Sequence, residues 1–474
     1  MTQSASAFPA GFLWGAATSA YQIEGSRNAD GTGVSIWDVF GKRPDVVEGG
    51  GDGSLACDSY RRWRDDIELL QAIGLNAYRF STGWSRVMPD GVGAANQLAL
   101  DHYDRQVDAL LEAGITPLIT LNHWDMPQAL MRSATDGGWL SRSTAEAFAQ
   151  YADAVTARLG DRVNRWITQC EPWIVQLLGY QVGLHAPGIK DLARSVIAGH
   201  HVLLGHGLAV DVIGANVADA QIGVALSLFP CTPASDSEAD ARAARGSDGY
   251  VNRWYLDPLT GRGYPADTRA LWEEIVERER GGFSLDEVIL PGDEEIIGRR
   301  LDFIGVNYYT RRVCAAADVG PDRAFPWAVV GPNGDVARSD EGWEIVPDQL
   351  CQLLLRLDRD YDHRPLIVTE NGAVFCDTPM HDKLVHDNRR IAFIRSHLQA
   401  VAAAISQGAT VLGYMHWSLL DNFEWALGYR PRFGLTYVDY ATGRRTLKDS
   451  AHFYGEIART GVIPDRDPAI IPYG

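Results

Sequence analysis

Short apolar runs alternate with amphipathic segments along most of the chain. In one amphipathic segment Trp63, Ile67, Leu70 and Ile73 are spaced by three or four residues, which places them on one helical face. The short runs are rich in branched residues and stop at polar or turn-forming residues, as buried parallel strands do. The predicted strands cover residues 11–15, 77–81, 116–121, 165–169, 222–226, 302–306, 366–369 and 411–415.

Eight strands that alternate with helices indicate a series of parallel βα units. No low-complexity linker or internal repeat divides the chain. We therefore predict an α/β fold: a single (β/α)8 TIM barrel with elaborated βα loops, with residues 1–474 forming one catalytic domain. An open doubly wound sheet is the alternative. It usually carries a glycine-rich turn after its first strand, and none is found there.

The acidic composition limits the partners of the chain. A net charge of −18 disfavours binding to nucleic acid or to an anionic membrane, both of which need a basic face. No apolar run approaches the ~20 residues of a membrane-spanning helix. Residues 1–9 lack the pattern of a secretory leader, and the six cysteines show no CxxC pair. We expect a cytoplasmic protein whose oligomeric state stays open.

A carboxylate at the end of the seventh predicted strand is the first candidate for chemistry. The strand leads through Val368 and Thr369 to Glu370, and Asn371 with Gly372 forms a turn signal directly after it. Side chains at the carboxyl ends of barrel strands enter a shared mouth, where barrel enzymes assemble their sites. Burying an unpaired charge there costs several kcal/mol, so a functional role is favoured.

Glu171 is the best partner for Glu370, because it also follows a predicted strand and precedes Pro172. Two carboxyl groups facing each other across a barrel mouth can perform acid–base or nucleophilic chemistry on an acetal. Arg79, at the end of the second strand, is placed to hold Glu370 ionised, and Glu171 then starts protonated with a raised pKa. A glutamate before proline is also common in loops, so this pairing alone leaves a structural role open.

Five long motifs make the chain resemble glycoside hydrolase family 1, the β-glucosidase family, along nearly its whole length. They are Phe12 to Gly25, Tyr78 to Ser81, Asn122 to Pro127, Thr369 to Gly372 and Trp417 to Trp425. The resemblance implies that Glu370 is the nucleophile and Glu171 the acid/base. It also implies a set of sugar-binding residues: Gln22, His123, Trp124, Cys170, Asn307, Tyr309, Trp343, Trp417, Glu424, Trp425 and Phe433.

Several of these residues have more specific implied roles. Glu424 spans the hydroxyls at C4 and C6 of the sugar, Trp417 forms the floor beneath the ring, and Trp343 lies towards the aglycone. The hydroxyl of Tyr309 contacts the nucleophile. Family members that cleave 6-phosphosugars replace the Glu424 position by a small residue, so an unphosphorylated glycone is expected here.

The chain departs from the family at Cys170, where the family usually has an asparagine that donates a hydrogen bond to the 2-hydroxyl of the sugar. Cysteine is a smaller and weaker donor. Losing a good transition-state hydrogen bond costs roughly 2.7–4 kcal/mol in comparable cases. Either the enzyme is slow on plain glucosides, or its substrate differs at C2, or the change is drift with water filling the gap. A cysteine nucleophile is rejected, because no base for the thiol is evident nearby in the sequence.

The resulting hypothesis is a retaining β-glycosidase that hydrolyses a small β-glycoside or oligosaccharide without a metal or other cofactor. Glu171 protonates the leaving oxygen while Glu370 attacks C1, which predicts a carboxyl separation of about 5–5.5 Å. A transglycosylase and a weakly active carbohydrate-binding barrel are the alternatives. His200, His201 and His206 lack metal-ligand spacing and are interpreted as packing or surface residues. The aglycone and the choice among glucose, galactose and fucose stay open.

Overall fold

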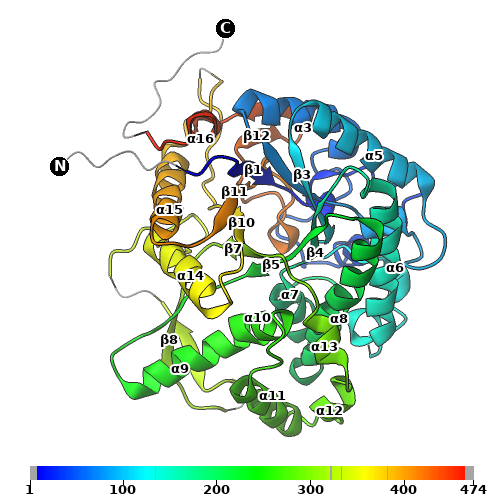
Figure 1. Cartoon of the computed structure of the whole chain (residues 1–474), viewed down its shortest axis with the longest axis vertical. Helices are drawn as coiled ribbons and strands as arrows, with labels where there is room; N and C mark the ends of the chain where they lie inside the picture. Colours follow the sequence, from blue (N-terminus) through cyan, green and yellow to red (C-terminus); the bar gives the residue numbers. More distant parts are fainter. Residues whose placement is uncertain (1–7, 134, 321–322, 332–333, 382, 465–474) are drawn as a thin grey trace.

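Eight parallel strands close into a barrel, which confirms the predicted fold class. The computed structural model describes residues 8–133, 135–320, 323–331, 334–381 and 383–464. Residues 1–7, on which the expectation of no leader largely rests, lie outside them. The strand order around the barrel is β1-β11-β10-β7-β5-β4-β3-β2, so each strand neighbours the next barrel strand in sequence. Figure 1 shows these strands at the centre of one half of the molecule, with helices around them.

The barrel strands begin and end close to their predicted positions. They are β1 (Leu13–Ala17), β2 (Ala77–Ser81), β3 (Thr116–Asn122), β4 (Arg165–Cys170), β5 (Gln221–Ser227), β7 (Phe303–Tyr308), β10 (Leu366–Asn371) and β11 (Val411–Trp417). The first strand was predicted two residues too early. Gly11 has φ +78°, and this turn conformation keeps it out of the strand.

Long helices pack outside the barrel, and shorter ones build its loops. The long helices are α3 (Ser59–Ile73), α5 (Gln97–Glu112), α6 (Arg142–Leu159), α8 (Leu192–Asn216), α9 (Glu238–Asp248), α11 (Ala266–Arg278), α14 (Pro347–Asp360), α15 (Asn388–Ser406) and α16 (Asp449–Thr460). The short α-helices are α1 (Ala20–Ile23), α2 (Ile36–Phe40), α4 (Trp84–Val87), α7 (Pro172–Ile174), α10 (Trp254–Leu259), α12 (Leu285–Val288) and α13 (Asp293–Ile297). Short segments of other helix types are the 3-10 helices η1 (Gln128–Leu130), η2 (Gly138–Leu140) and η5 (Trp425–Leu427) and the π-helices η3 (Val175–Gln181) and η4 (Gly249–Arg253).

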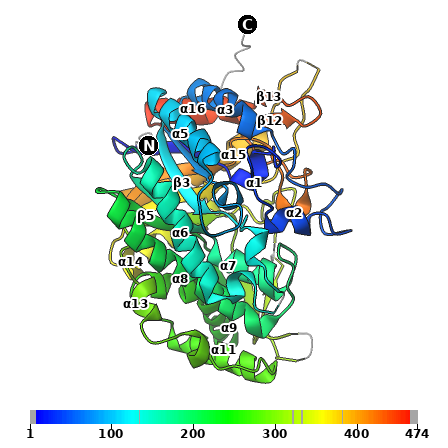
Figure 2. The same ribbon diagram turned by 90° about the vertical axis from the view of Figure 1, so that its right-hand side faces the viewer.

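Two small sheets lie outside the barrel. One contains β6 (Cys231–Pro233), β8 (Arg312–Ala316) and β9 (Trp327–Val330), and the other contains β12 (Thr436–Asp439) and β13 (Arg444–Leu447). In both views β12 lies near α3 at one end of the molecule, and α9 and α11 lie at the opposite end (Figures 1 and 2). The segment between β5 and β7 therefore enlarges the protein on one side of the barrel.

The strands are buried on both faces, and their alternation divides the core into two layers. On β10, Leu366 and Val368 pack outward against the helices, whereas Ile367 joins a cluster inside the barrel. Gly15 allows the inner layer to pack closely, because a Cβ added there would lie 2.2 Å from the sulfur of Met415. The barrel interior is thus filled below its mouth, and any site must lie above this layer.

Helix α8 departs from the expectation that no segment is long enough to span a membrane. By length and composition alone this helix could cross a membrane. However, 78% of its apolar 18-residue stretch is buried within the protein. It packs against α6 and the barrel, and several of its residues on all sides, including Val202, Leu203 and Leu204, are buried. An all-round apolar helix is what such a position requires.

Candidate active site

A cavity of about 370 Å³ opens at the carboxyl ends of the barrel strands. Ten of the predicted site residues line it: His123, Trp124, Glu171, Tyr309, Trp343, Glu370, Trp417, Glu424, Trp425 and Phe433. Four more predicted residues are fully buried beside or behind its wall: Gln22, Arg79, Cys170 and Asn307. Residues up to about 400 positions apart in sequence therefore meet at one place, as the strand-end argument predicted.

Glu370 is held by two donors on its two oxygens. Arg79 Nη1 donates to Oε1 at 2.5 Å, and the Tyr309 hydroxyl donates to Oε2 at 2.6 Å. Arg79 is fully buried and also donates to the carbonyl of Thr369 at 3.2 Å. A guanidinium and a hydroxyl that both donate to one carboxylate stabilise its ionised form. The register of β10 against β7 shifts between Val368 and Glu370, and this irregularity re-aims the strand end at the mouth.

Glu171 lies in a different electrostatic environment. Burial first, and then the charge of Glu370, raise the pKa of Glu171 to about 8, while Asn307 donates to its Oε1 at 2.8 Å. The backbone of Glu171 is left-handed, with φ +52°, and Pro172 directly after it begins α7. The sharp exit from β4 turns the carboxyl into the cavity. At neutral pH the raised pKa thus favours the protonated form of Glu171.

A third carboxyl group, Glu424, shares the cavity. Burial and then the charge of Glu370 raise its pKa to about 8, and hydrogen bonds from Trp417 and Gln22 oppose this shift. Glu424 Oε1 is buried without a hydrogen-bond partner among the described residues. Gln22 is fixed by Ser19, whose hydroxyl donates to it at 2.6 Å, and Gln22 donates to Asn422 at 3.1 Å. An unsatisfied buried oxygen at the wall is free to accept a hydroxyl from a bound molecule.

Aromatic rings cover much of the remaining wall. The ring of His123 stacks on Trp417 with centroids 5.8 Å apart, and Trp124 lies 4.9 Å from Trp425. On the other side Tyr309 lies 5.6 Å from Trp343, which is 37% exposed and therefore stands at the rim. Flat apolar faces combined with few polar groups are typical of small-molecule sites.

Cys170 lies beside Glu370. Its sulfur accepts from Arg79 Nη2 at 3.1 Å and lies 3.5 Å from Glu370 Oε1 and 3.7 Å from Asn307 Nδ2. Asn307 also accepts from the Thr369 hydroxyl at 2.7 Å. Cys170 therefore belongs to the polar layer that supports both carboxyl groups. Its backbone carbonyl accepts from Trp124 Nε1 at 2.9 Å.

The sequence analysis missed part of the wall. The additional lining residues are Ile174, Leu178, His185, Ser227, Phe229, Thr310, Glu341 and Leu427. Ser227 ends β5 and Thr310 follows Tyr309, so the strand-end rule could have found both. Ile174 and Leu178 belong to α7 and η3, and their position depends on how that helix packs over the mouth. Local sequence carries no signal for such contacts.

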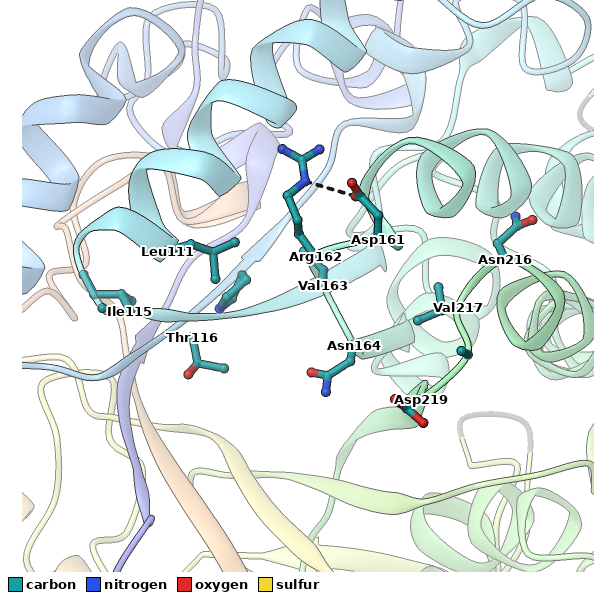
Figure 3. Close-up of a pocket in the computed structure, with 14 residues that line it drawn as sticks. Leu111, Ile115, Thr116, Asp161, Arg162, Val163, Asn164, Asn216, Val217 and Asp219 are labelled. Atoms are coloured by element: carbon teal, nitrogen blue, oxygen red, sulfur yellow. Dashed lines mark hydrogen bonds and ion pairs between the residues drawn. The ribbon is translucent and has the colours of Figure 1, made fainter.

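A second cavity, of about 590 Å³, lies at the opposite end of the barrel. Figure 3 shows the residues that line it. It is lined by the loops that lead into β3, β4 and β5, which include Asn164 and Asp219, and by Thr116, the first residue of β3. The three histidines of α8 lie in neither cavity wall. His200 contacts Tyr264 and Asp293, His201 contacts the carbonyl of Trp139, and His206 contacts the hydroxyl of Thr168, all as buried side chains.

Comparison with known proteins places the chain in a family. The sequence profile of glycosyl hydrolase family 1 matches residues 4–462. Beta-glucosidase A of Thermotoga maritima is 41% identical over 459 residues, which cover 97% of this chain and 99% of that protein. The bifunctional beta-D-glucosidase/beta-D-fucosidase of Bifidobacterium breve is 41% identical over 461 residues, covering 94% of this chain and 97% of its own.

The fold agrees as closely as the sequence. The solved family 1 β-glucosidase from Thermotoga maritima superposes with a TM-score of 0.90 at 40% identity, covering 98% of this chain and 100% of that chain. Further structures of that enzyme hold isofagomine lactam, glucoimidazole or deoxynojirimycin. With motifs, sequence and fold in agreement over nearly its full length, this chain belongs to glycosyl hydrolase family 1.

Proposed function

We propose that this protein is a retaining β-glucosidase that hydrolyses unphosphorylated β-glycosides, with residues 1–474 acting as one catalytic unit. The observation that carries the proposal is the pairing of Glu171 and Glu370 in one cavity, the first buried with a raised pKa and the second held by Arg79 and Tyr309. An acid and a nucleophile that act on the same acetal need unlike environments of this kind. From its composition, we expect the enzyme to act in the cytoplasm.

In the first step Glu370 attacks the anomeric carbon while Glu171 donates its proton to the departing oxygen. The glycosyl–enzyme ester forms as the glycosidic bond breaks, and the alcohol leaves with the proton of Glu171. In the second step Glu171, now a carboxylate, takes a proton from water as the water oxygen attacks the same carbon. The two inversions retain the β configuration. Arg79 and Tyr309 stabilise the Glu370 carboxylate before attack and again when it is released.

The residues around Glu424 support a glucose-type glycone. Glu424 Oε1 is free to accept from sugar hydroxyls, and Trp417 packs beside His123 where the face of a sugar ring can stack. Relatives include a beta-glucosidase and a bifunctional beta-D-glucosidase/beta-D-fucosidase, so both glycones belong in the test. The smaller Cys170 leaves the 2-hydroxyl without the donor that asparagine supplies in the family, and we propose that hydrolysis of glucosides is slowed by this exchange.

The outer part of the cavity indicates the class of aglycone. Ile174, Leu178, Phe229 and Leu427 give it apolar walls, and Trp343 stands at its rim. Burying an aryl or alkyl group against such a surface gives more binding free energy than burying a second sugar. The hydroxyls of the sugar would lose their hydrogen bonds to water without finding new partners. We therefore propose that aryl and alkyl β-glucosides are better substrates than cellobiose. Equal kcat/KM values for phenyl β-glucoside and cellobiose would contradict this.

The mechanism is tested by following hydrolysis of p-nitrophenyl β-glucoside by proton NMR. A retaining enzyme releases the β-anomer of glucose first, whereas an inverting enzyme releases the α-anomer. A 2-fluoro-2-deoxyglucoside should trap the intermediate, and peptide mass spectrometry should find the added mass on Glu370. The same reaction with an added alcohol separates a hydrolase from a transglycosylase, because a transglycosylase gives mainly the alkyl glycoside.

A further inference from the structure

Three metal-ligand atoms meet at the base of the active-site cavity. A ring nitrogen of His123, the sulfur of Cys170 and a carboxylate oxygen of Glu370 all lie within 4.8 Å of one another, and all three residues are buried. They come from the ends of β3, β4 and β10. We propose that these residues form a binding site for a thiophilic divalent cation such as zinc or cadmium, and that the bound cation inhibits the enzyme.

The donor set fits such an ion. Zinc-type sites use imidazole nitrogen, thiolate sulfur and carboxylate oxygen, with bond lengths of about 2.0–2.3 Å and three protein ligands when the fourth position stays open. The sulfur of Cys170 and Oε1 of Glu370 lie 3.5 Å apart, close to the spacing of two ligands on a tetrahedral ion with such bonds, and a His123 ring nitrogen lies within 4.8 Å of the other two ligand atoms. His123 and Glu370 both line the cavity, so an ion has an entry path and solvent can fill its fourth position.

His123 is available as a ligand. Its Nδ1 is buried without a hydrogen-bond partner among the described residues. Imidazole nitrogen is a common zinc ligand, and a bond at Nδ1 would break no hydrogen bond among the described residues.

Arg79 determines which cations can bind. Its guanidinium donates to both Cys170 and Glu370, so a second positive charge there is opposed. Calcium and magnesium prefer six or more oxygen ligands, whereas this donor set contains a single carboxylate, that of Glu370. Only an ion with a strong preference for sulfur and nitrogen overcomes this repulsion. Binding forms the metal–sulfur bond and breaks the S–H bond, and the thiol proton leaves to solvent.

The proposed site depends on the sulfur of Cys170. Asparagine, which the family usually has at position 170, cannot supply a thiolate. The predicted inhibition rests on the proposed function, since a cation on Glu370 and His123 occupies the nucleophile and the sugar-binding wall. The binding itself does not rest on it, and the two are measured separately.

The test is a cadmium titration of the EDTA-treated, desalted protein, followed by the ultraviolet thiolate-to-cadmium absorption band and by calorimetry. We expect one high-affinity cadmium per chain at this site, and deoxynojirimycin should weaken its binding. Inhibition of aryl glucoside hydrolysis should be competitive and reversed by EDTA, and magnesium and calcium at the same concentration should leave the rate unchanged. In Cys170→Ser, cadmium affinity should fall at least about tenfold.

Two matched variants separate this site from other thiols. Cys376 is exposed, and Cys231 and Cys314 lie against each other, so each can bind cadmium adventitiously. Cys376→Ser and Cys231→Ser should keep the deoxynojirimycin-sensitive band. Equal bands and equal affinity in the wild type and Cys170→Ser would overturn the proposal. A cadmium band without any hydrolase activity would preserve the site and overturn the proposed function instead.

Discussion

The two ends of the barrel differ in a way that free volume does not reveal. The cavity at the amino-terminal ends of the strands, about 590 Å³, is larger than the cavity at their carboxyl ends, about 370 Å³. Its charged side chains are solvated: the Asp161 side chain is 68% exposed and bonds to Arg162. At the mouth the Glu370 side chain is 5% exposed against a fully buried Arg79. Desolvated, opposed ionisable groups locate the chemistry, whereas size alone does not.

The largest expected contrast between the ends comes from Glu370→Gly. Removing a covalent nucleophile should lower kcat/KM for p-nitrophenyl β-glucoside by about 10⁴-fold or more. Asp219→Asn, in the wall of the opposite cavity, should leave kcat/KM unchanged. Steady-state kinetics on both variants, with circular dichroism to confirm folding, decides the matter. Substantial hydrolysis by Glu370→Gly would remove the basis for placing the chemistry at the mouth.

Glu171→Gln should have the next largest effect, and its size should depend on the leaving group. General acid catalysis contributes typically about 10²–10⁴-fold. We expect a loss of that order for phenyl β-glucoside and a much smaller loss in bond cleavage for dinitrophenyl β-glucoside, whose phenolate needs no proton. Kinetics over a series of aryl glucosides measures this dependence. A uniform loss across the series would assign Glu171 a positioning role only.

Cys170→Asn should increase activity. The asparagine side-chain oxygen can accept a hydrogen bond from Arg79, as the sulfur does now. The asparagine NH2 group can then donate to the 2-hydroxyl of the sugar. A transition-state bond of this kind is worth about 2.7–4 kcal/mol elsewhere, so a gain of about tenfold or more in kcat/KM for glucosides is expected. The matched control is the 2-deoxyglucoside, which lacks the hydroxyl and should gain little. Equal gains on both substrates would refute this explanation.

The pH dependence should show the raised pKa of Glu171. Because the acid must be protonated, kcat/KM should fall about tenfold per pH unit above the pKa of about 8. Glu424 has a similarly raised pKa, so an experiment must show which of the two residues causes the loss of activity at high pH. In Glu171→Gln, with dinitrophenyl glucoside as substrate, the fall of kcat/KM at high pH should disappear. If the fall persists, Glu424 causes it.

The barrel was predictable from sequence because its strands carry a local signal. The apolar run of Ile367 and Val368 is followed by the turn-forming residues Asn371 and Gly372. In a similar way, each of the eight strands is an apolar run that stops at polar or turn-forming residues. The carboxyl pair was predictable because strand ends converge. The contact of Cys170 with Arg79 was not predictable, because it depends on the side-chain conformations of two residues that lie 91 positions apart in the sequence. The apolar outer wall around Leu178 and Phe229 was missed for the same reason: loop packing over the mouth decides it.

The smallest expected effect is at the solvated end, in Arg162→Gln. Arg162 pairs with Asp104, Asp108 and Asp161, with its side chain 28% exposed. Exposed ion pairs contribute about 0–1 kcal/mol each, so the melting temperature should fall only slightly and less so in high salt. No change in kcat/KM is expected. Arg79→Gln is the opposite case, because it leaves the buried carboxylate of Glu370 without its cation and should reduce kcat/KM steeply. A tenfold loss of activity in Arg162→Gln at unchanged stability would instead couple the two ends of the barrel.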